Sequence, residues 1–214
     1  MSTTHTVTTI KDTTGNPAVL GLLCFGMTTV LLNVSNAGLF KMNSMILGMG
    51  IFTGGLAQVI AGVQEWKKNN TFGATAFTAY GMFWITLVAI VLIPQTSFGA
   101  GFAPDGASMG MFLFLWGVFT LYMFFGTLKL NRMLQVVFFT LVILFFLLAI
   151  GEFTGNKSWS VFAGYEGIIC GLSAMYGSAA LVLNEVYGRS VLPVGERKRT
   201  AVFIEEEEMP SMAS

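Results

Sequence analysis

The sequence predicts an all-α membrane protein with six transmembrane helices and both termini on the cytoplasmic side. Three observations carry this prediction: six apolar stretches of about membrane-spanning length, a charged-residue content of only 10%, and basic residues that gather in alternate gaps between the stretches. A soluble domain has about a quarter of its residues charged. Lipid offers the backbone no hydrogen-bond partners, so each stretch is expected to form a helix.

A helix of about 20 residues crosses the hydrocarbon layer of a bilayer, which is roughly 30 Å thick. The predicted helices are Pro17–Val34, Ser44–Gln64, Thr71–Ile93, Ala107–Leu128, Met133–Ile150 and Trp159–Leu183. The first begins after Asn16 because Asn is a favoured N-cap and Pro is favoured at the first helical position. In the second, Gly50 and Gly54 lie four residues apart. This spacing lets helices approach closely in lipid.

The later predicted helices differ in the residues that they contain. The third holds Tyr80 among small and hydroxyl-bearing residues, and the fourth follows the only long connection, Gln95–Gly106. The fifth contains two Phe pairs, which begin at Phe138 and Phe145, and is expected to contact lipid over much of its surface. The sixth repeats the four-residue spacing of small residues, starting at Gly167.

The basic residues predict the orientation, because short loops rich in Lys and Arg stay in the cytoplasm. Of the 11 Lys and Arg residues, only Lys41 and Lys157 fall on the side of the bundle opposite to the termini. We therefore expect a multi-pass protein of the cell membrane, with one transmembrane domain at residues 16–188. A disordered arm at 1–15 precedes this domain, and a cytoplasmic tail at 189–214 follows it.

Several chemistries are excluded by what the chain lacks. Its net charge is zero, which gives no electrostatic case for a nucleic-acid partner. The only His, His5, lies in the predicted arm, and Cys24 and Cys170 lie within spans, where they indicate neither a disulfide framework nor a metal site. There is no nucleotide-binding motif. We therefore expect neither an enzyme nor a cofactor-binding protein.

Polar residues inside the spans are the candidates for function. Most are neutral, such as Thr28 and Gln58, and each by itself is typical of a hydrogen bond between helices. Because the spans carry no buried cation, these neutral residues together indicate a pathway that binds its solute weakly. Most acidic residues lie at helix ends, as Glu65 does. Glu166 lies about two turns inside the last helix and is a candidate proton site, unless it faces a wet external vestibule.

A more specific signal is the segment Asn16–Leu22, which reads NPAVLGL. It resembles the NPAPLGL signature of the acetate uptake transporters, a family that includes bacterial succinate–acetate permeases. Residues 25–29, 73–80, 115–129 and 182–195 also resemble family segments and follow the family's order. Val19 departs from the signature, which usually has Pro there.

The resemblance implies a six-helix protomer in a homo-oligomer, a hexamer, with a path for acetate, and in some members succinate, through each subunit. The family's narrow hydrophobic constriction matches Phe25, Tyr80 and Leu141. Substrate contacts match Asn16, Thr28, Gln58 and Ala174. The implied partners are thus a small carboxylate, the lipid bilayer and further copies of the chain. The residues alone also leave open a less selective anion channel or a non-conducting scaffold or sensor, and passive or proton-coupled transport.

Overall fold

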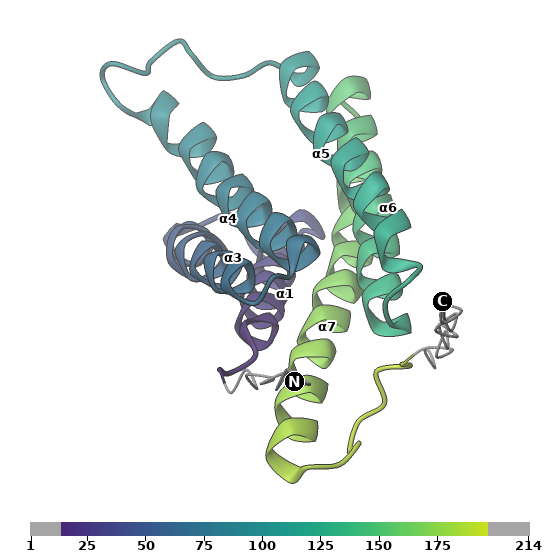
Figure 1. The fold of residues 1–214 in the computed structure, drawn as a ribbon. Helices are drawn as coiled ribbons and strands as arrows, with labels where there is room; N and C mark the ends of the chain where they lie inside the picture. The colour runs from purple at the N-terminus through teal and green to yellow at the C-terminus, as the bar shows by residue number, and fades with distance from the viewer. Residues whose placement is uncertain (1–13, 197–214) are drawn as a thin grey trace, which may run out of the picture.

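In the computed structural model, which describes residues 14–196, the chain forms a bundle of long helices (Figure 1). Six helices among the described residues are long and apolar enough to cross a membrane. The predicted all-α class and the number of spans are therefore confirmed. Nearly all of the predicted arm, and the tail beyond residue 196, lie outside the described residues.

The spans begin and end close to where the sequence places them. They are α1 (Pro17–Asn36), the continuous span α2, η1 and α3 (Ser44–Gly48, Met49–Ala57 and Gln58–Lys67), α4 (Thr71–Leu92) with the 3-10 turn η2 (Ile93–Gln95), α5 (Gly106–Thr127), α6 (Arg132–Thr154) and α7 (Lys157–Tyr187). Each span follows a residue whose side-chain oxygen accepts from a backbone amide of the first turn. These caps are Asn16, Asn43, Asn70, Asp105, Asn131 and Asn156. Such caps satisfy amides that the helix itself leaves unpaired.

The middle of the second span, η1, is π-helical, so its backbone is wound more widely than in an α-helix. Its glycines lie against the neighbouring helices. A Cβ on Gly54 would lie 2.8 Å from Thr28 of α1, and one on Gly50 would lie 2.6 Å from Val88 of α4. The small residues of this span therefore serve close packing between helices of the same chain. The π-helical winding itself was not predicted.

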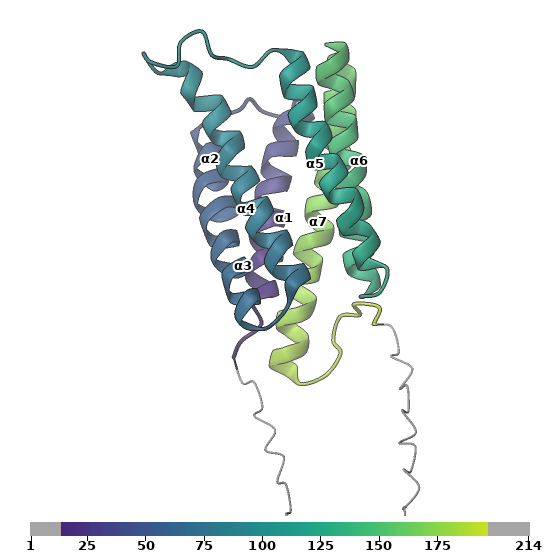
Figure 2. The ribbon, with the colours of Figure 1, turned by 45° about the horizontal axis from the view of Figure 1, so that its top comes forward.

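Helices α1 and α7 make the most extensive contact among the described helices and lie side by side in the bundle (Figure 2). A Cβ on Gly171 would lie only 2.7 Å from the carbonyl oxygen of Gly26, and a Cβ on Gly167 would overlap the side chain of Asn33. Glycine is required at these positions because the backbone of α1 and the Asn33 side chain leave no room for a larger residue. The small-residue spacing predicted for the last helix thus packs α7 against α1.

The two Phe pairs of α6 divide between the interior of the bundle and its outer surface. Phe138 and Phe145 are only 4% and 3% exposed, whereas Phe139 is 53% exposed. The reason is helical geometry: Phe138, Leu141 and Phe145 follow a spacing of three and four residues and share the face that packs into the bundle.

The described chain begins and ends at the same end of the bundle (Figure 2), as an even number of spans requires. That this end is cytoplasmic stays a prediction. After α7 the chain returns to the start of α6. The amides of Arg132 and Met133 donate to the carbonyls of Gly195 and Val194, at 3.1 and 3.2 Å. Asn184 holds the returning segment by accepting from the backbone at residues 191 and 192.

The close contact of α1 with α7 predicts a large difference between two Gly→Ala changes. Gly171→Ala should destabilise the protein by about 1–3 kcal/mol, because the new methyl group meets the backbone of α1. Gly48→Ala should be neutral or slightly stabilising, because nothing lies within 4 Å of its added Cβ. Thermal unfolding of both variants in detergent tests this. Equal shifts in Tm would contradict the close packing of α7 against α1 at Gly171.

Candidate functional site

Three cavities lie between the helices, and each shares wall residues with the next. The inner cavity, of about 230 Å³, lies at the end of the bundle where α1, α4 and α6 begin. The middle cavity, of about 20 Å³, shares Leu22, Ala76, Phe77 and Phe138 with it. The outer cavity, of about 30 Å³, shares Phe25, Tyr80 and Leu141 with the middle one. These shared residues place the cavities in series through the bundle.

Three helix N-termini converge on the inner cavity. Asn16, Asn70 and Asn131, the N-caps of α1, α4 and α6, all line it. Their side-chain oxygens accept from the amides of residues 18, 73 and 134 at 3.1, 3.1 and 2.9 Å. Because the N-terminus of a helix carries a partial positive charge, this cavity favours an anion although no Lys or Arg of the described chain lines it.

Phe25, Tyr80 and Leu141 line both the middle and the outer cavity, and we call these three residues the neck. All three side chains are buried, and the rings of Phe25 and Tyr80 lie 5.8 Å apart. The Tyr80 hydroxyl lies 2.9 Å from Oγ1 of Thr120 on α5. Since that Thr hydroxyl donates to the carbonyl of Trp116, Tyr80 is the donor to Thr120. This bond ties the polar end of Tyr80 to α5.

Beyond the neck, the outer cavity offers polar atoms without partners among the described residues. Oγ1 of Thr29 and Nε1 of Trp84 are buried and unpaired, and both residues line this cavity. On the other side of the neck, Gln58 lines the middle cavity and its Oε1 is also unpaired. Buried polar atoms without partners are rare in folded proteins. Their position beside a chain of cavities gives a solute or water hydrogen bonds along the way.

A charged residue that the sequence analysis placed at a helix end also lines the inner cavity. Glu65 is only 2% exposed, and its Oε2 accepts from Nδ2 of Asn70 at 2.7 Å. Its other oxygen, Oε1, is buried and has no partner among residues 14–196. The sequence alone gave no signal for this burial, because Glu65 is followed by Lys67 and Lys68, a pattern typical of a solvated helix end.

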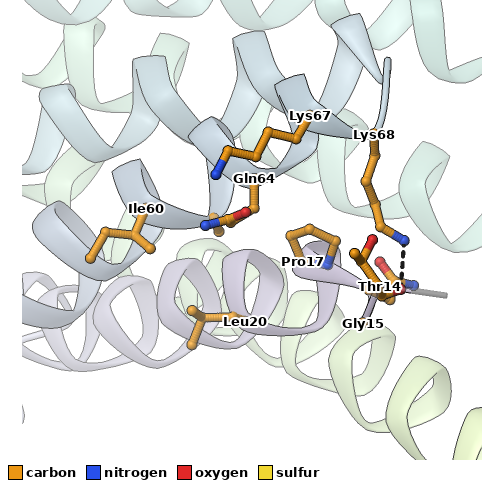
Figure 3. A pocket seen from close by; sticks show the side chains of 10 residues that line it. Thr14, Gly15, Pro17, Leu20, Ile60, Gln64, Lys67 and Lys68 are labelled. Carbon is orange, nitrogen blue, oxygen red and sulfur yellow. Dashed lines mark hydrogen bonds between the residues drawn. The ribbon is translucent and has the colours of Figure 1, made fainter. Parts of the chain in front are cut away.

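Beside the inner cavity lies a separate groove of about 410 Å³ between the start of α1 and the end of α3 (Figure 3). Leu20 and Ile60 line it from the two helices, and Lys67 lies along its edge. Lys68 donates from Nζ to the carbonyl of Thr14 at 3.0 Å. Asn16 lines both this groove and the inner cavity, so the two hollows are neighbours.

A family model described as the GPR1/FUN34/yaaH family matches residues 2–195. The chain belongs to this family. The succinate-acetate/proton symporter SatP of Escherichia coli (strain K12) is 59% identical over 181 residues, which cover 85% of this chain and 95% of the relative. Acetate permease A of Emericella nidulans is 33% identical over 195 residues, which cover 84% of this chain and 65% of the relative.

A solved structure, described as that of the bacterial acetate channel SatP, superposes with a TM-score of 0.82 at 58% identity. The match covers 85% of this chain and 99% of that one. These matches confirm the family resemblance seen in residues 16–22. They also confirm that this GPR1/FUN34/yaaH chain is a multi-pass membrane protein of a transporter family and not an enzyme.

The structure brings most of the predicted site residues of this family member to the cavities. Asn16 lines the inner one, Gln58 the middle one, and the three neck residues line two of them. Thr28 and Ala174 are fully buried but are not among the residues that line these three cavities. Thr29, next to Thr28, lines the outer one instead.

Glu166 is also absent from the walls of the three cavities. Both of its carboxylate oxygens are buried and unpaired among the described residues. It lies on α7 one turn before Cys170, whose thiol contacts the carbonyl of Val137 on α6 at 3.7 Å. The proton-site assignment for Glu166 stays a prediction.

The bond between Tyr80 and Thr120 predicts a specific order of stabilities. Tyr80→Phe should cost about 0.5–1.5 kcal/mol, because one hydrogen bond is lost and Thr120 keeps its bond to Trp116. Thr120→Val should cost more, about 1–3 kcal/mol, because it leaves the Tyr80 hydroxyl buried without a partner.

The double variant Tyr80→Phe/Thr120→Val should be more stable than Thr120→Val alone, since it removes the orphaned hydroxyl as well. Thermal unfolding of the three variants in detergent measures this order. Strict additivity of the two single changes would contradict the pairing.

Proposed function

We propose that this chain is a membrane channel or transporter for acetate and related small carboxylates, including succinate. In this proposal the solute passes through the three cavities of each protomer and crosses the hydrophobic neck. The observation that carries the proposal is the series of cavities, which begins between three helix N-termini and whose two smaller members share Phe25, Tyr80 and Leu141. The names of the relatives, an acetate permease, an acetate channel and a succinate-acetate symporter, support the same substrates.

The need for such a path follows from the chemistry of acetate. With a carboxyl pKa of about 4.3, roughly one molecule in 500 is neutral at pH 7, and the anion crosses lipid poorly. A buried cation would bind the anion strongly, whereas conduction requires binding weak enough to permit exit. Helix dipoles and neutral side chains meet this requirement. Asn16 at the mouth, with Gln58, Thr28 and Ala174 deeper in the bundle, are the proposed substrate-binding residues.

The neck is proposed to select solutes by size. A water molecule needs a cavity of roughly 10–15 Å³, so the cavities on either side of the neck, of about 20 and 30 Å³, hold one or two waters each. Acetate is larger than this. Its passage therefore requires the neck side chains to move, and a dry ring of this kind closes again when they return.

The orientation and assembly are part of the same proposal. Both termini are proposed to be cytoplasmic, which makes the inner cavity the cytoplasmic mouth. The protomer is proposed to act within a homo-oligomer, a hexamer as the family resemblance implies, with one path in each copy. The large apolar side chains that stay exposed on the outside of the bundle fit contact with lipid or with neighbouring copies.

The test is uptake of labelled acetate by liposomes that contain the purified protein, compared with empty liposomes of the same lipid. We expect faster uptake with the protein. A scaffold or sensor would give no difference, and this outcome would overturn the proposal. Reversal potentials in acetate and chloride gradients separate a carboxylate path from a less selective anion channel, because only the latter passes chloride equally well.

Widening the neck should relax size selection. Phe25→Ala removes a ring that lines two cavities, and we expect the ratio of acetate to succinate uptake to fall by about tenfold or more. The matched control is Phe139→Ala, which removes an exposed ring on the outer face of α6 and should leave the ratio unchanged. An unchanged ratio in both variants would remove Phe25 from the selective step.

Loss of the cap at the mouth should weaken uptake without preventing insertion. Asn16→Ala removes the cap of α1 at a cost of about 1 kcal/mol, together with an amide that lines the inner cavity. The matched control, Asn43→Ala, removes the cap of α2 at the opposite end of the bundle. Both variants should lose similar stability in thermal unfolding. Only Asn16→Ala should lower acetate uptake per folded protein, and equal losses of uptake would make Asn16 purely structural.

A further inference from the structure

Glu65 is a carboxylate in an unusual place, at the entrance of a path for anions. Its Oε2 accepts from Asn70 at 2.7 Å, and its Oε1 is buried without a partner among the described residues. A Cβ on Gly73 would lie 2.9 Å from Glu65 Cδ, so α4 packs directly against the carboxyl group. The side chain is thus fixed at the wall of the inner cavity with one oxygen free for a further hydrogen bond.

Among residues 14–196, no other ionisable side chain lines this cavity. The residues that face it from α1, α4, α6 and α7 are neutral amides, such as Asn131, or apolar side chains, such as Leu181. The nearest basic residues in sequence, Lys67 and Lys68, line the neighbouring groove (Figure 3). A negative charge on Glu65 therefore meets the helix dipoles of the cavity and no neutralising side chain.

The Glu65 carboxylate limits the protonation states in which a carboxylate solute can occupy the inner cavity. Two carboxylates that share a site cannot both be ionised at low cost, and such pairs hold one proton between them. A carboxylate anion drawn into the inner cavity by the helix N-termini comes next to Glu65. Its stable occupancy therefore requires one proton on the pair.

We propose that Glu65 is the proton-binding group of this pathway, which carries a proton whenever a carboxylate anion occupies the inner cavity. The inference rests on the proposed function. One proton from the aqueous phase binds Oε1, and the resulting O–H donates to the carboxylate of the solute. If the proton stays on Glu65, the anion leaves toward water. If the O–H bond of Glu65 breaks and one forms on the solute, a neutral acid faces the apolar neck and Glu65 is again a carboxylate.

The experiment measures the initial rate of labelled acetate uptake above the empty-liposome rate, with equal pH on both sides, from pH 6 to pH 8. In the unmodified protein the rate should fall with rising pH, by up to tenfold per unit above the midpoint of its profile, because fewer of the carboxylate pairs formed by Glu65 and the solute then hold the shared proton. Glu65→Gln imitates the protonated acid, keeps an oxygen to accept from Asn70, and should change by less than twofold over this range. Glu185→Gln, the same change at an exposed carboxylate at the end of α7, should follow the unmodified protein.

Three outcomes would overturn the proposal. The first is a Glu65→Gln variant that keeps the pH profile of the unmodified protein. The second is a folded Glu65→Gln variant that transports at no pH. The third is a flat profile in the unmodified protein itself. A flat profile in Glu166→Gln beside a normal one in Glu65→Gln is a case of the first outcome and would assign the proton to α7. Absence of acetate uptake by the unmodified protein would instead contradict the proposed function, and is distinct from all three.

A second variant keeps the test valid if Glu65→Gln fails to fold, as judged by size-exclusion chromatography. Asn70→Asp retains an oxygen that can cap α4 but puts a second carboxylate beside Glu65. The two acids then share a proton, and the midpoint of the pH profile should move up by at least about one unit. An unchanged midpoint in this variant would also overturn the proposal.

Discussion

A carboxylate that crosses a bilayer must leave most of its water behind, and the protein has to replace that water without holding the ion. In the proposed path this replacement comes, at the entrance, from the N-termini of α1, α4 and α6, which meet at one cavity. Dipoles attract a charge more weakly than a cation in direct contact does. The absence of Lys and Arg from the inner cavity wall is therefore consistent with a path through which ions move on.

The rest of the path depends on how closely the helices approach. Gly26 and Gly171 bring the backbones of α1 and α7 together, and Gly54 brings the second span against α1. This packing seals the bundle and leaves only small cavities near its centre. Phe25, from the same helix as Gly26, then reaches Tyr80 of α4 across the remaining space. The neck is thus a product of glycine packing as well as of its own large side chains.

Much of the fold could be predicted from the sequence, because a backbone in lipid must satisfy its hydrogen bonds within the helix itself. Length and apolarity predicted the six spans, and the Asn–Pro start predicted the first residue of α1. The family resemblance, carried by residues 16–22, pointed to a neck whose three residues do lie together. An Asn or Asp precedes every span, and this regular signal would have placed the remaining helix starts as well.

The features that the sequence did not predict depend on which face of a helix packs into the bundle. Phe138 and Phe145 resemble lipid-facing residues in composition, and only the packing of α6 shows that they face the bundle. Glu65 resembles an ordinary helix-end acid, and its burial follows from the turn at Asn70 that folds back over it. The π-helical winding of η1, whose glycines pack against α1 and α4, was also not predicted.

The segment after α7 makes the electrostatic field at the inner cavity uneven. Carbonyls of Val194 and Gly195 already occupy the first amides of α6, while its N-cap occupies the amide of residue 134. The field of α6 is thereby partly cancelled, and its donors are lost to any solute. In the proposed path an incoming anion therefore meets the field of α4, on the side where Glu65 lies, more fully than that of α6.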